Sequence, residues 1–290
     1  MKFGLSTVTR GVFSSRENYM AVAKAAERAG FDFLSVSDHL IVPAKLESHY
    51  PYTVSGVFAA AEHGHCFDQL ATVAFLAGCT ERLRLLTSVL VVPHRPAVLT
   101  AKILATIDVL SNGRLIFGLG VGWCEPEMRS VGAPFAERGR VADDYLAAMR
   151  AVWTQPKPSY RGPYVAFDGV QAMPRPVQTP VPIVVGGRTA PAYRRAVTQG
   201  HGWYGFGINV EDTQKIVATL RDIAKKHSRP AELGRLEISV TPPSPEVPDA
   251  GTVDAYAAAG VDRLIIRPKP DMDAAALERF AADAGHALIR

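Results

Sequence analysis

The chain has 290 residues, of which 48% are hydrophobic, enough to build either one barrel-sized domain or two ordinary ones. Its 32 Lys and Arg against 28 Asp and Glu include no long basic run, which argues against nucleic acid as a partner. The sequence shows no signal-peptide pattern and no apolar run of about 18 residues, so we expect a cytoplasmic protein without a membrane span, whose three cysteines are reduced thiols.

Strands and helices are predicted to alternate along the whole chain. Apolar runs bounded by turn residues predict buried strands, and apolar residues at helical spacing predict the segments between them. In chain order the predicted elements are strand 2–6, helix 14–30, strand 31–37, helix 68–78, strand 83–92, helix 99–110, strand 114–119, helix 139–153, strand 181–185, a helix from 189, strand 202–206, helix 210–227, strand 236–240, helix 252–259, strand 263–267 and a last helix over 277–288. Eight strands, each followed by a helix, favour one α/β domain over residues 1–290, a single (β/α)8 TIM barrel, over a doubly wound sheet.

Turn residues mark several of the predicted element ends. The first helix is predicted to begin at the capping box Ser14-x-x-Glu17 and to end at Gly30, and Asn112-Gly113 is a left-handed stop. Three proline-rich stretches have no regular period, and we expect them to be long loops at the carboxyl-terminal mouth of the barrel that shape a substrate pocket. They cover residues 40–67, 155–180 and 241–251.

Polar residues cluster where the predicted strands end, which is where a TIM barrel carries its functional groups. They are Ser6-Thr7, Asp38-His39, Thr87-Ser88, His94, Gly118 to Trp123, Gly186-Gly187-Arg188, Thr241, and Arg267 with Lys269. His39 is a candidate general acid or base, because imidazole changes charge near neutral pH, and Asp38 could orient it. The alternative is a structural histidine that is hydrogen-bonded to its neighbour.

Two glycine-rich segments suggest close approach of the backbone to a ligand. Gly118-x-Gly120-x-Gly122 invites a dinucleotide-binding interpretation, but Trp123 occupies the place of the third glycine, and Cys124-Glu125-Pro126 makes an immediate helix doubtful. Gly186-Gly187-Arg188, followed by Thr189 as a helix cap, suits an anion better, since it offers backbone N–H groups and a helix N-terminus. An ordinary strand–helix corner is the alternative.

Metal and thiol chemistry are weakly indicated. His63-Gly-His65-Cys66 resembles a metal cluster, but it lies in a loop and has no carboxylate at fixed spacing, so we predict no metal. Cys124 has no helper base beside it in sequence, so a catalytic thiol is not expected.

Several segments, in this order, resemble the bacterial luciferase-like monooxygenase superfamily on its coenzyme F420-dependent side. They are Ser37-Asp-His39, Asp68-x-Leu70, CTERLRLLTSVLVVPHRP, AKILATIDVLSNGRLIFGLGVGW, VPIVVGGRTAPAYRRAVTQGHGW and AAAGVDRLIIRP. The resemblance covers essentially the whole chain. It implies a TIM barrel that holds a flavin or deazaflavin in its carboxyl-terminal mouth, with a non-proline cis peptide in the third strand behind the ring; Ser88–Val89 matches that bond.

The resemblance also implies site residues. Asp38 and His39 match positions that line the ring and are the implied catalytic pair. The implied cofactor-binding residues are Thr87, Ser88, Val89, Gly120, Val121, Gly122, Trp123, Gly186, Gly187 and Arg188. In the sugar-phosphate dehydrogenases of this group a Glu follows the strand-four glycines, where this chain has Trp123, and a Trp beyond the strand-two His is missing from Leu40 to Pro43. Sugar-phosphate oxidation is therefore not expected, and Trp123 is predicted to shape an apolar pocket.

The expected function is hydride transfer between coenzyme F420 and a small organic substrate. One alternative is an FMN-dependent monooxygenase that works with a flavin reductase. A second is a non-catalytic flavin-binding protein, and a metal-dependent barrel hydrolase is a more distant one. By analogy with relatives we expect a homo-oligomer, with an F420 or flavin reductase as a possible partner.

Overall fold

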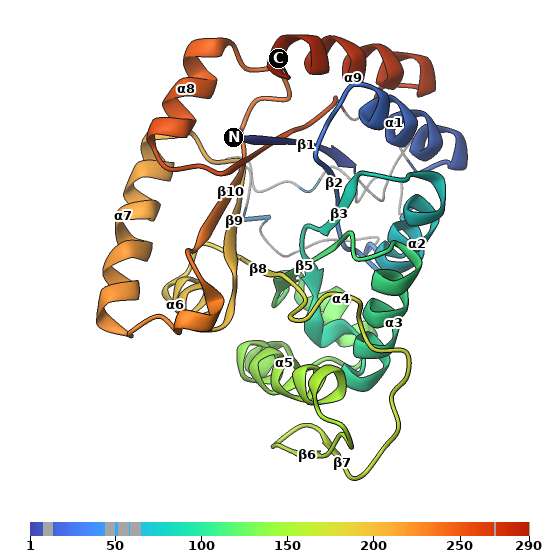
Figure 1. Cartoon of the computed structure of the whole chain (residues 1–290), viewed down its shortest axis with the longest axis vertical. Helices are drawn as coiled ribbons and strands as arrows, with labels where there is room; N and C mark the ends of the chain where they lie inside the picture. Colours follow the sequence, from blue (N-terminus) through green and yellow to red (C-terminus); the bar gives the residue numbers. More distant parts are fainter. Residues whose placement is uncertain (8–13, 44–49, 52–57, 59–64, 270, 290) are drawn as a thin grey trace.

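Parallel strands close into a barrel in the computed structural model, which describes residues 1–7, 14–43, 50–51, 58, 65–269 and 271–289 (Figure 1). The sheet order is β3-β2-β1-β11-β10-β9-β8-β5-β4, and an additional pairing of β3 with β5 closes it. The strands are β1 (Lys2–Thr7), β2 (Phe33–Val36), β3 (Arg84–Thr87), β4 (Leu90–Val91), β5 (Leu115–Gly120), β8 (Ile183–Gly186), β9 (Gly202–Phe206), β10 (Glu237–Thr241) and β11 (Arg263–Ile266). Since β3 and β4 are two halves of one strand, the described chain forms the predicted eight-stranded TIM barrel.

Helices follow the strands and surround the barrel (Figure 1). They are α1 (Arg16–Arg28), α2 (Gln69–Cys79), α3 (Ala97–Leu110), α4 (Glu125–Ser130), α5 (Arg138–Thr154), α6 (Ala190–Gln199), α7 (Val210–Lys226), α8 (Ala250–Ala258) and α9 (Ala274–Leu288), with 3-10 turns η3 (Val92–His94), η4 (Phe135–Glu137) and η5 (Ala231–Leu233). Within the described ranges, none of these helices has the length and apolar character needed to cross a bilayer.

The helix ends follow the predicted turn chemistry with one exception. Gly30, Asn112 and Gly113 have positive φ angles of 84°, 54° and 75°, as left-handed stops require. The predicted capping box at Ser14 is wrong. The cap is Ser15, whose side chain accepts the Asn18 N–H at 3.1 Å, because the helix begins one residue later than the pattern suggested.

Two apolar layers hold the barrel together. The larger layer lies between strands and helices, and the smaller one fills the interior of the barrel. The interior residues come from six strands and are Phe33, Leu86, Ile116, Val184, Tyr204 and Ile265, with Val89 and Phe206 packed against them. Val89 and Phe206 stand at or after the carboxyl ends of their strands, so they form the top of this interior core.

The predicted third strand, 83–92, is interrupted. Pairing stops after Thr87 and resumes at Leu90, and the Ser88–Val89 peptide bond between them is cis, which confirms the prediction drawn from the resemblance. The strand also ends earlier than predicted, because Val92–His94 forms a 3-10 turn around Pro93, which has no N–H for a ladder.

The segment 155–180 lies at the opposite end of the barrel from the one predicted. It contains a hairpin, β6 (Tyr160–Arg161) with β7 (Ala166–Phe167), and it joins the end of α5 to the start of β8. Near its end Gln178 contacts the first residues of two strands: its Oε1 accepts from Arg84 at 2.9 Å, and its Nε2 donates to the Leu115 carbonyl at 2.8 Å. These contacts place it at the amino ends of the strands, away from the mouth.

Candidate active site

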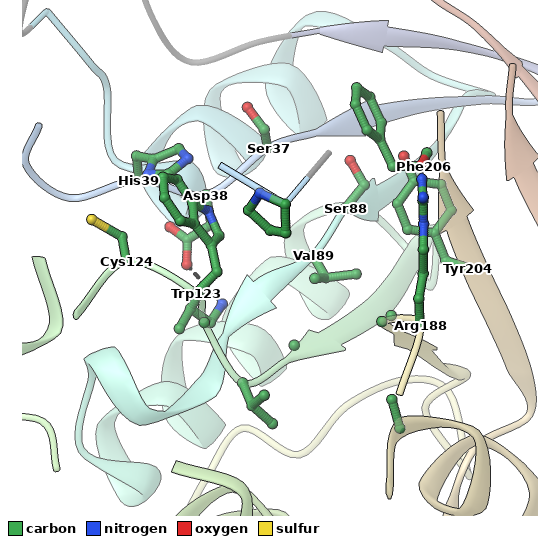
Figure 2. Close-up of a pocket in the computed structure, with 18 of the residues that line it drawn as sticks. Ser37, Asp38, His39, Ser88, Val89, Trp123, Cys124, Arg188, Tyr204 and Phe206 are labelled. Carbon is green, nitrogen blue, oxygen red and sulfur yellow. Dashed lines mark hydrogen bonds between the residues drawn. The ribbon is translucent and has the colours of Figure 1, made fainter. Parts of the chain in front are cut away.

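A cavity of about 500 Å³ opens at the carboxyl ends of the strands and is lined by residues from most of them. Figure 2 shows its two ends, with the segment carrying Ser88 and Val89 between them. We call one the histidine end, formed by His39, His94, Trp123, Cys124 and Glu127. We call the other the arginine end, formed by Arg188, Tyr204, Phe206 and Arg267.

The floor of the cavity is the Val89 side chain, and the neighbouring glycines leave the space that this side chain occupies. A Cβ placed on Gly120 would lie 2.4 Å from a Val89 methyl group, and one on Gly186 would lie 2.9 Å from it. A Cβ on Gly118 would lie 1.7 Å from the Thr87 carbonyl oxygen. The glycine-rich segment does admit a close approach, but what approaches is the bulge of the same chain, which is the interruption between β3 and β4 at Ser88 and Val89.

This geometry changes the interpretation of three predicted binding residues. Gly118 and Gly120 belong to strand β5, and it is Gly122, with a φ of 85°, that turns the chain. Thr87 lies beneath the floor and outside the cavity lining, where its hydroxyl accepts the Gly118 N–H at 2.7 Å and donates to the Gly118 carbonyl at 3.0 Å. Thr87 therefore locks the bulge onto β5.

His39 is paired with a carboxylate from a distant part of the chain. Its Nδ1 lies 2.9 Å from Oε2 of Glu127, and both side chains are buried. The other oxygen of Glu127 accepts the Leu40 N–H at 2.7 Å. Burial alone would raise the pKa of Glu127, but the hydrogen bonds from His39 and Leu40 hold that pKa below its ordinary value, so the carboxylate stays ionised. An ionised carboxylate at Nδ1 requires a proton there, which leaves Nε2 as the nitrogen that exchanges a proton.

Asp38 does not orient His39, which corrects the expectation from the sequence. Its carboxylate accepts the Val91 N–H at 2.8 Å and two hydrogen bonds from Arg95, at 2.9 and 3.0 Å. Arg95 also donates to Asp68, the cap of α2, at 2.6 Å. Asp38 thus fixes β4, next to the floor, and ties it to the segment that carries His39.

Glu127 was missed because α4 was missed. Cys124-Glu125-Pro126 does not interrupt the chain as a loop: a proline and acidic residues in a first turn are typical of a helix start, and α4 begins at Glu125. That signal could have revealed the helix. The pairing with His39 spans 88 residues and leaves no trace in local periodicity.

An aromatic cluster forms the wall beside His39. The Trp123 ring centroid lies 5.3 Å from that of Phe58 and 5.1 Å from that of Tyr50, and the His39 centroid lies 4.8 Å from Phe58. Edge-to-face pairs at these distances are attractive, so the rings stabilise one another. Trp123 therefore contributes to an apolar wall, as predicted. Most of the predicted 40–67 loop lies outside the described residues, but Tyr50 and Pro51 do line the cavity.

His94 is a second buried imidazole at the same end. It is 6% exposed, and within the described part of the chain neither of its ring nitrogens has a hydrogen-bond partner. Burial lowers the pKa of His94, and the neighbouring Arg95 and His39 lower it further. The carboxylates of Asp38 and Glu127 raise it, but the net effect is a lowered pKa. The ring is therefore neutral at physiological pH.

This burial predicts a pH-dependent stability. The unfolded chain binds a proton at His94 near the ordinary pKa of 6.5, whereas the folded chain binds it only at lower pH, so the free energy of unfolding falls as the pH drops below 6.5. His94→Gln removes this contribution and should flatten the decline by at most about 1.4 kcal/mol per pH unit. Denaturant unfolding of both proteins between about pH 7.5 and 5.5 measures the difference. Equal slopes would contradict it.

The arginine end offers cations beside aromatic rings. Arg188 donates to the carbonyls of Phe206 and Gly207, and Arg267 lies 5.4 Å from the centroid of Phe206 and donates to the Pro243 carbonyl at 2.7 Å. The Nε of Arg267 is buried without a partner. Three other strand-end candidates do not line the cavity. Lys269 is exposed, the Thr7 hydroxyl donates to the Ser35 carbonyl at 3.1 Å, and the Thr241 hydroxyl lies 2.9 Å from that of Tyr204.

The metal and thiol interpretations gain no support. His63 lies outside the described residues, and Cys66 donates to the Leu40 carbonyl at 3.3 Å. Among the residues that are described, no three potential ligands come together around a metal site. Burial raises the pKa of the Cys124 thiol, which disfavours the reactive thiolate.

Comparisons with known proteins agree with this fold. The model of the luciferase-like monooxygenase family matches residues 1–285. An uncharacterized protein of Mycobacterium tuberculosis is 33% identical over 290 residues, which cover 97% of this chain and 98% of that protein. The FMNH2-dependent dimethylsulfone monooxygenase of Pseudomonas putida is 28% identical over 221 residues, covering 74% of this chain and 60% of that protein.

Two solved structures share the barrel at low sequence identity. The monooxygenase RslO1 of Streptomyces bottropensis superposes with a TM-score of 0.75 at 20% identity, over 100% of this chain and 99% of that one. An F420-dependent secondary alcohol dehydrogenase, solved with an F420–acetone adduct, gives 0.74 at 14% identity, over 97% and 98%. Because the family model spans nearly the whole chain, and a relative that matches over its full length shares a third of the aligned residues, this chain belongs to the luciferase-like monooxygenase family of oxidoreductases.

Proposed function

We propose that the protein transfers a hydride between coenzyme F420 and a small organic substrate bound in the cavity. The observation that carries the proposal is the layout of the cavity, in which an apolar floor at Val89 separates the buried His39–Glu127 pair from a cationic end (Figure 2). A planar, anionic cofactor with its reactive edge toward an imidazole matches this layout.

The residues present fit such a cofactor. Val89, with the glycines that hold it, offers a flat apolar surface for a ring. Arg188 and Arg267 provide positive charge for a phosphate or an acidic tail, and the unpartnered Nε of Arg267 is a donor that a bound anion would satisfy. Gly120 to Trp123 and Gly186-Gly187 border the space between, so the cofactor-binding residues expected from the sequence, apart from the buried Thr87, remain our proposal.

The protein contributes proton handling and orientation, and bound F420 would supply the ring carbon that exchanges the hydride. In oxidation, Nε2 of His39 accepts the proton of a substrate hydroxyl as the carbon–hydrogen bond is broken; in reduction, it returns that proton to the oxygen. Glu127, ionised and fixed by Leu40 N–H, stabilises the imidazolium that forms in the first case. The aromatic wall and the apolar floor keep water away from the reacting atoms.

An FMN-dependent monooxygenase is the second candidate, and the observation that favours it is the similarity to a dimethylsulfone monooxygenase that uses FMNH2. The same floor and arginine end would accept the ring and phosphate of FMN. In that case a flavin reductase is the partner, and oxygen consumption with supplied reduced FMN should exceed that of a protein-free control. A flavin-binding protein without catalysis is the third candidate.

Direct titration separates the F420 candidate from the FMN candidate. We expect F420 to bind with a dissociation constant in the micromolar range or below, and to bind more tightly than FMN, as followed by its absorbance and fluorescence. Arg188→Ala and Arg267→Ala should each weaken F420 binding about tenfold, which corresponds to the loss of one charge-assisted contact of about 1.4 kcal/mol. Failure of both cofactors to bind would overturn the proposal, and tighter binding of FMN would favour the monooxygenase.

A further inference from the structure

The histidine end also indicates which class of substrate it accepts, an inference that rests on the proposed function. Both of its buried carboxylates are already paired within the protein. Glu127 is bound to His39 at 2.9 Å, and Asp38 is bound to Arg95 at 2.9 and 3.0 Å. A charged substrate would have to give up its water here, and a cation would gain no free carboxylate from this pair of acids.

Arg138 borders the cavity as well, but its guanidinium is engaged elsewhere. Its Nε donates to the Gly122 carbonyl at 3.2 Å, and its Nη1 donates to the Phe135 carbonyl at 2.8 Å. The group also lies 4.0 Å from the centroid of the Phe135 ring. Arg138 therefore holds the turn that carries Trp123, and any anion at this end would compete with those contacts.

The wall of this end is aromatic and closed. Trp123, Tyr50 and Phe58 lie within 5.3 Å of one another, centroid to centroid, so no ring can enter between them. Trp123 and Tyr50 line the cavity beside His39, and the buried Phe58 packs against both of them. Such a surface favours an apolar or aromatic body that packs against it from the cavity side.

His94 supplies a polar group that the fold leaves unused. Its ring lines the cavity, although both nitrogens are covered and unpartnered, so its cavity-facing atoms are carbons. The two flip states of an imidazole have nearly the same shape, and a half-turn about the Cβ–Cγ bond exchanges the nitrogens with ring carbons. A buried polar group without a hydrogen-bond partner is destabilising, so a ligand that forms a hydrogen bond with His94 removes that penalty.

We propose that the substrate is an uncharged alcohol or carbonyl compound with an apolar, ring-sized body, whose oxygen is hydrogen-bonded by His39 and by His94. The body packs on the wall at Trp123. His94 is in this proposal a specificity-determining residue: as a neutral ring it can donate to a carbonyl oxygen or accept from a hydroxyl, but it cannot balance the charge of a carboxylate.

Three probes of similar size test this proposal on the full-length protein: toluene, benzyl alcohol and benzoate. They share the ring and differ in oxygen and charge. We expect benzyl alcohol to bind at least tenfold more tightly than toluene or benzoate, measured by calorimetry or equilibrium dialysis. In ¹⁵N-labelled protein, the side-chain nitrogens of His94 should shift on adding benzyl alcohol and stay unchanged with toluene.

Variants at His94 and Trp123 test which side chain causes the preference for benzyl alcohol. His94→Phe keeps a flat ring and should lower the affinity for benzyl alcohol five- to tenfold while leaving toluene unchanged; His94→Gln, which keeps a neutral donor and acceptor, should restore most of the loss. Trp123→Leu should weaken benzyl alcohol and toluene alike. His286→Phe, on the exposed side of α9, is the matched control and should bind like the unmodified protein.

The following outcomes overturn the proposal. Tightest binding of benzoate would make this end an anion site. Equal binding of toluene and benzyl alcohol, or no binding of any probe, would exclude the proposed class. An unchanged preference in His94→Phe would remove His94 from it. Because the probes are tested without cofactor, and F420 and FMN are titrated separately, failure here is distinguishable from failure of the proposed function.

Discussion

Replacing His39 by Ala is expected to lower kcat by about 10²- to 10⁴-fold, the usual contribution of a positioned acid–base group. The reason is that Nε2 of His39, whose Nδ1 is bound to Glu127, is the atom that we propose exchanges the proton. F420 affinity should change little, because the proposed cofactor contacts lie at the floor and at the arginine end. Stopped-flow or steady-state absorbance of F420, with an identified substrate, gives kcat, and titration gives the affinity.

Two further variants interpret that result. Glu127→Gln keeps the size of the side chain but removes its charge, so it should lower kcat less than His39→Ala does, while leaving the fold intact. His286→Ala changes an exposed histidine and should have no effect. If His39→Ala retained full turnover, His39 would not be the proton-exchanging group and the proposed mechanism would be wrong.

Gly118→Ala is expected to disrupt the site from below, with a loss of folding stability of about 3–5 kcal/mol. The added Cβ would lie 1.7 Å from the Thr87 carbonyl oxygen, which is backbone and cannot move aside as a flexible side chain would. Either β5 or the bulged segment at Ser88 and Val89 must shift, so we also expect F420 binding to be lost or strongly weakened. Denaturant unfolding and F420 titration measure the two effects.

Gly78→Ala is the control for this variant. Gly78 lies in α2, its φ is unremarkable, and a Cβ there would meet nothing within 4 Å. Alanine should therefore leave the protein unchanged or stabilise it by about 0.5–1 kcal/mol, because it restricts the unfolded chain. Should Gly118→Ala behave like Gly78→Ala, the close packing of β5 on the bulge would not be what requires glycine there.

The sequence was sufficient to predict the barrel and the positions at its strand ends. The signals are local: aliphatic runs of strand length, helical spacing between them, and stop residues such as Gly30 and Asn112-Gly113. The structure has strands, helices and left-handed residues at these places. Because parallel strands in a barrel all point one way, the residues after each strand had to meet at one mouth. His39, Trp123 and Arg188 accordingly line one cavity.

Only the tertiary structure decided how those residues are paired. Asp38 is next to His39 in sequence, yet its carboxylate is used by Arg95 and Val91, and the partner of His39 is Glu127. The side of the barrel on which the 155–180 segment lies was also misjudged from its composition. Turn residues and proline occur in the loops at both ends of a barrel, so composition does not distinguish one end from the other.

The glycine-rich strand shows the same division. Its residues indicated that something must come close to the backbone at Gly118 and Gly120, and this was correct. What comes close is Thr87 and Val89, some 30 residues earlier in the chain, as the hydrogen bonds between Thr87 and Gly118 with a separation of 31 residues show. Local sequence determines backbone shape because steric limits act between neighbours, whereas contacts between distant residues depend on how the strands align once the barrel closes.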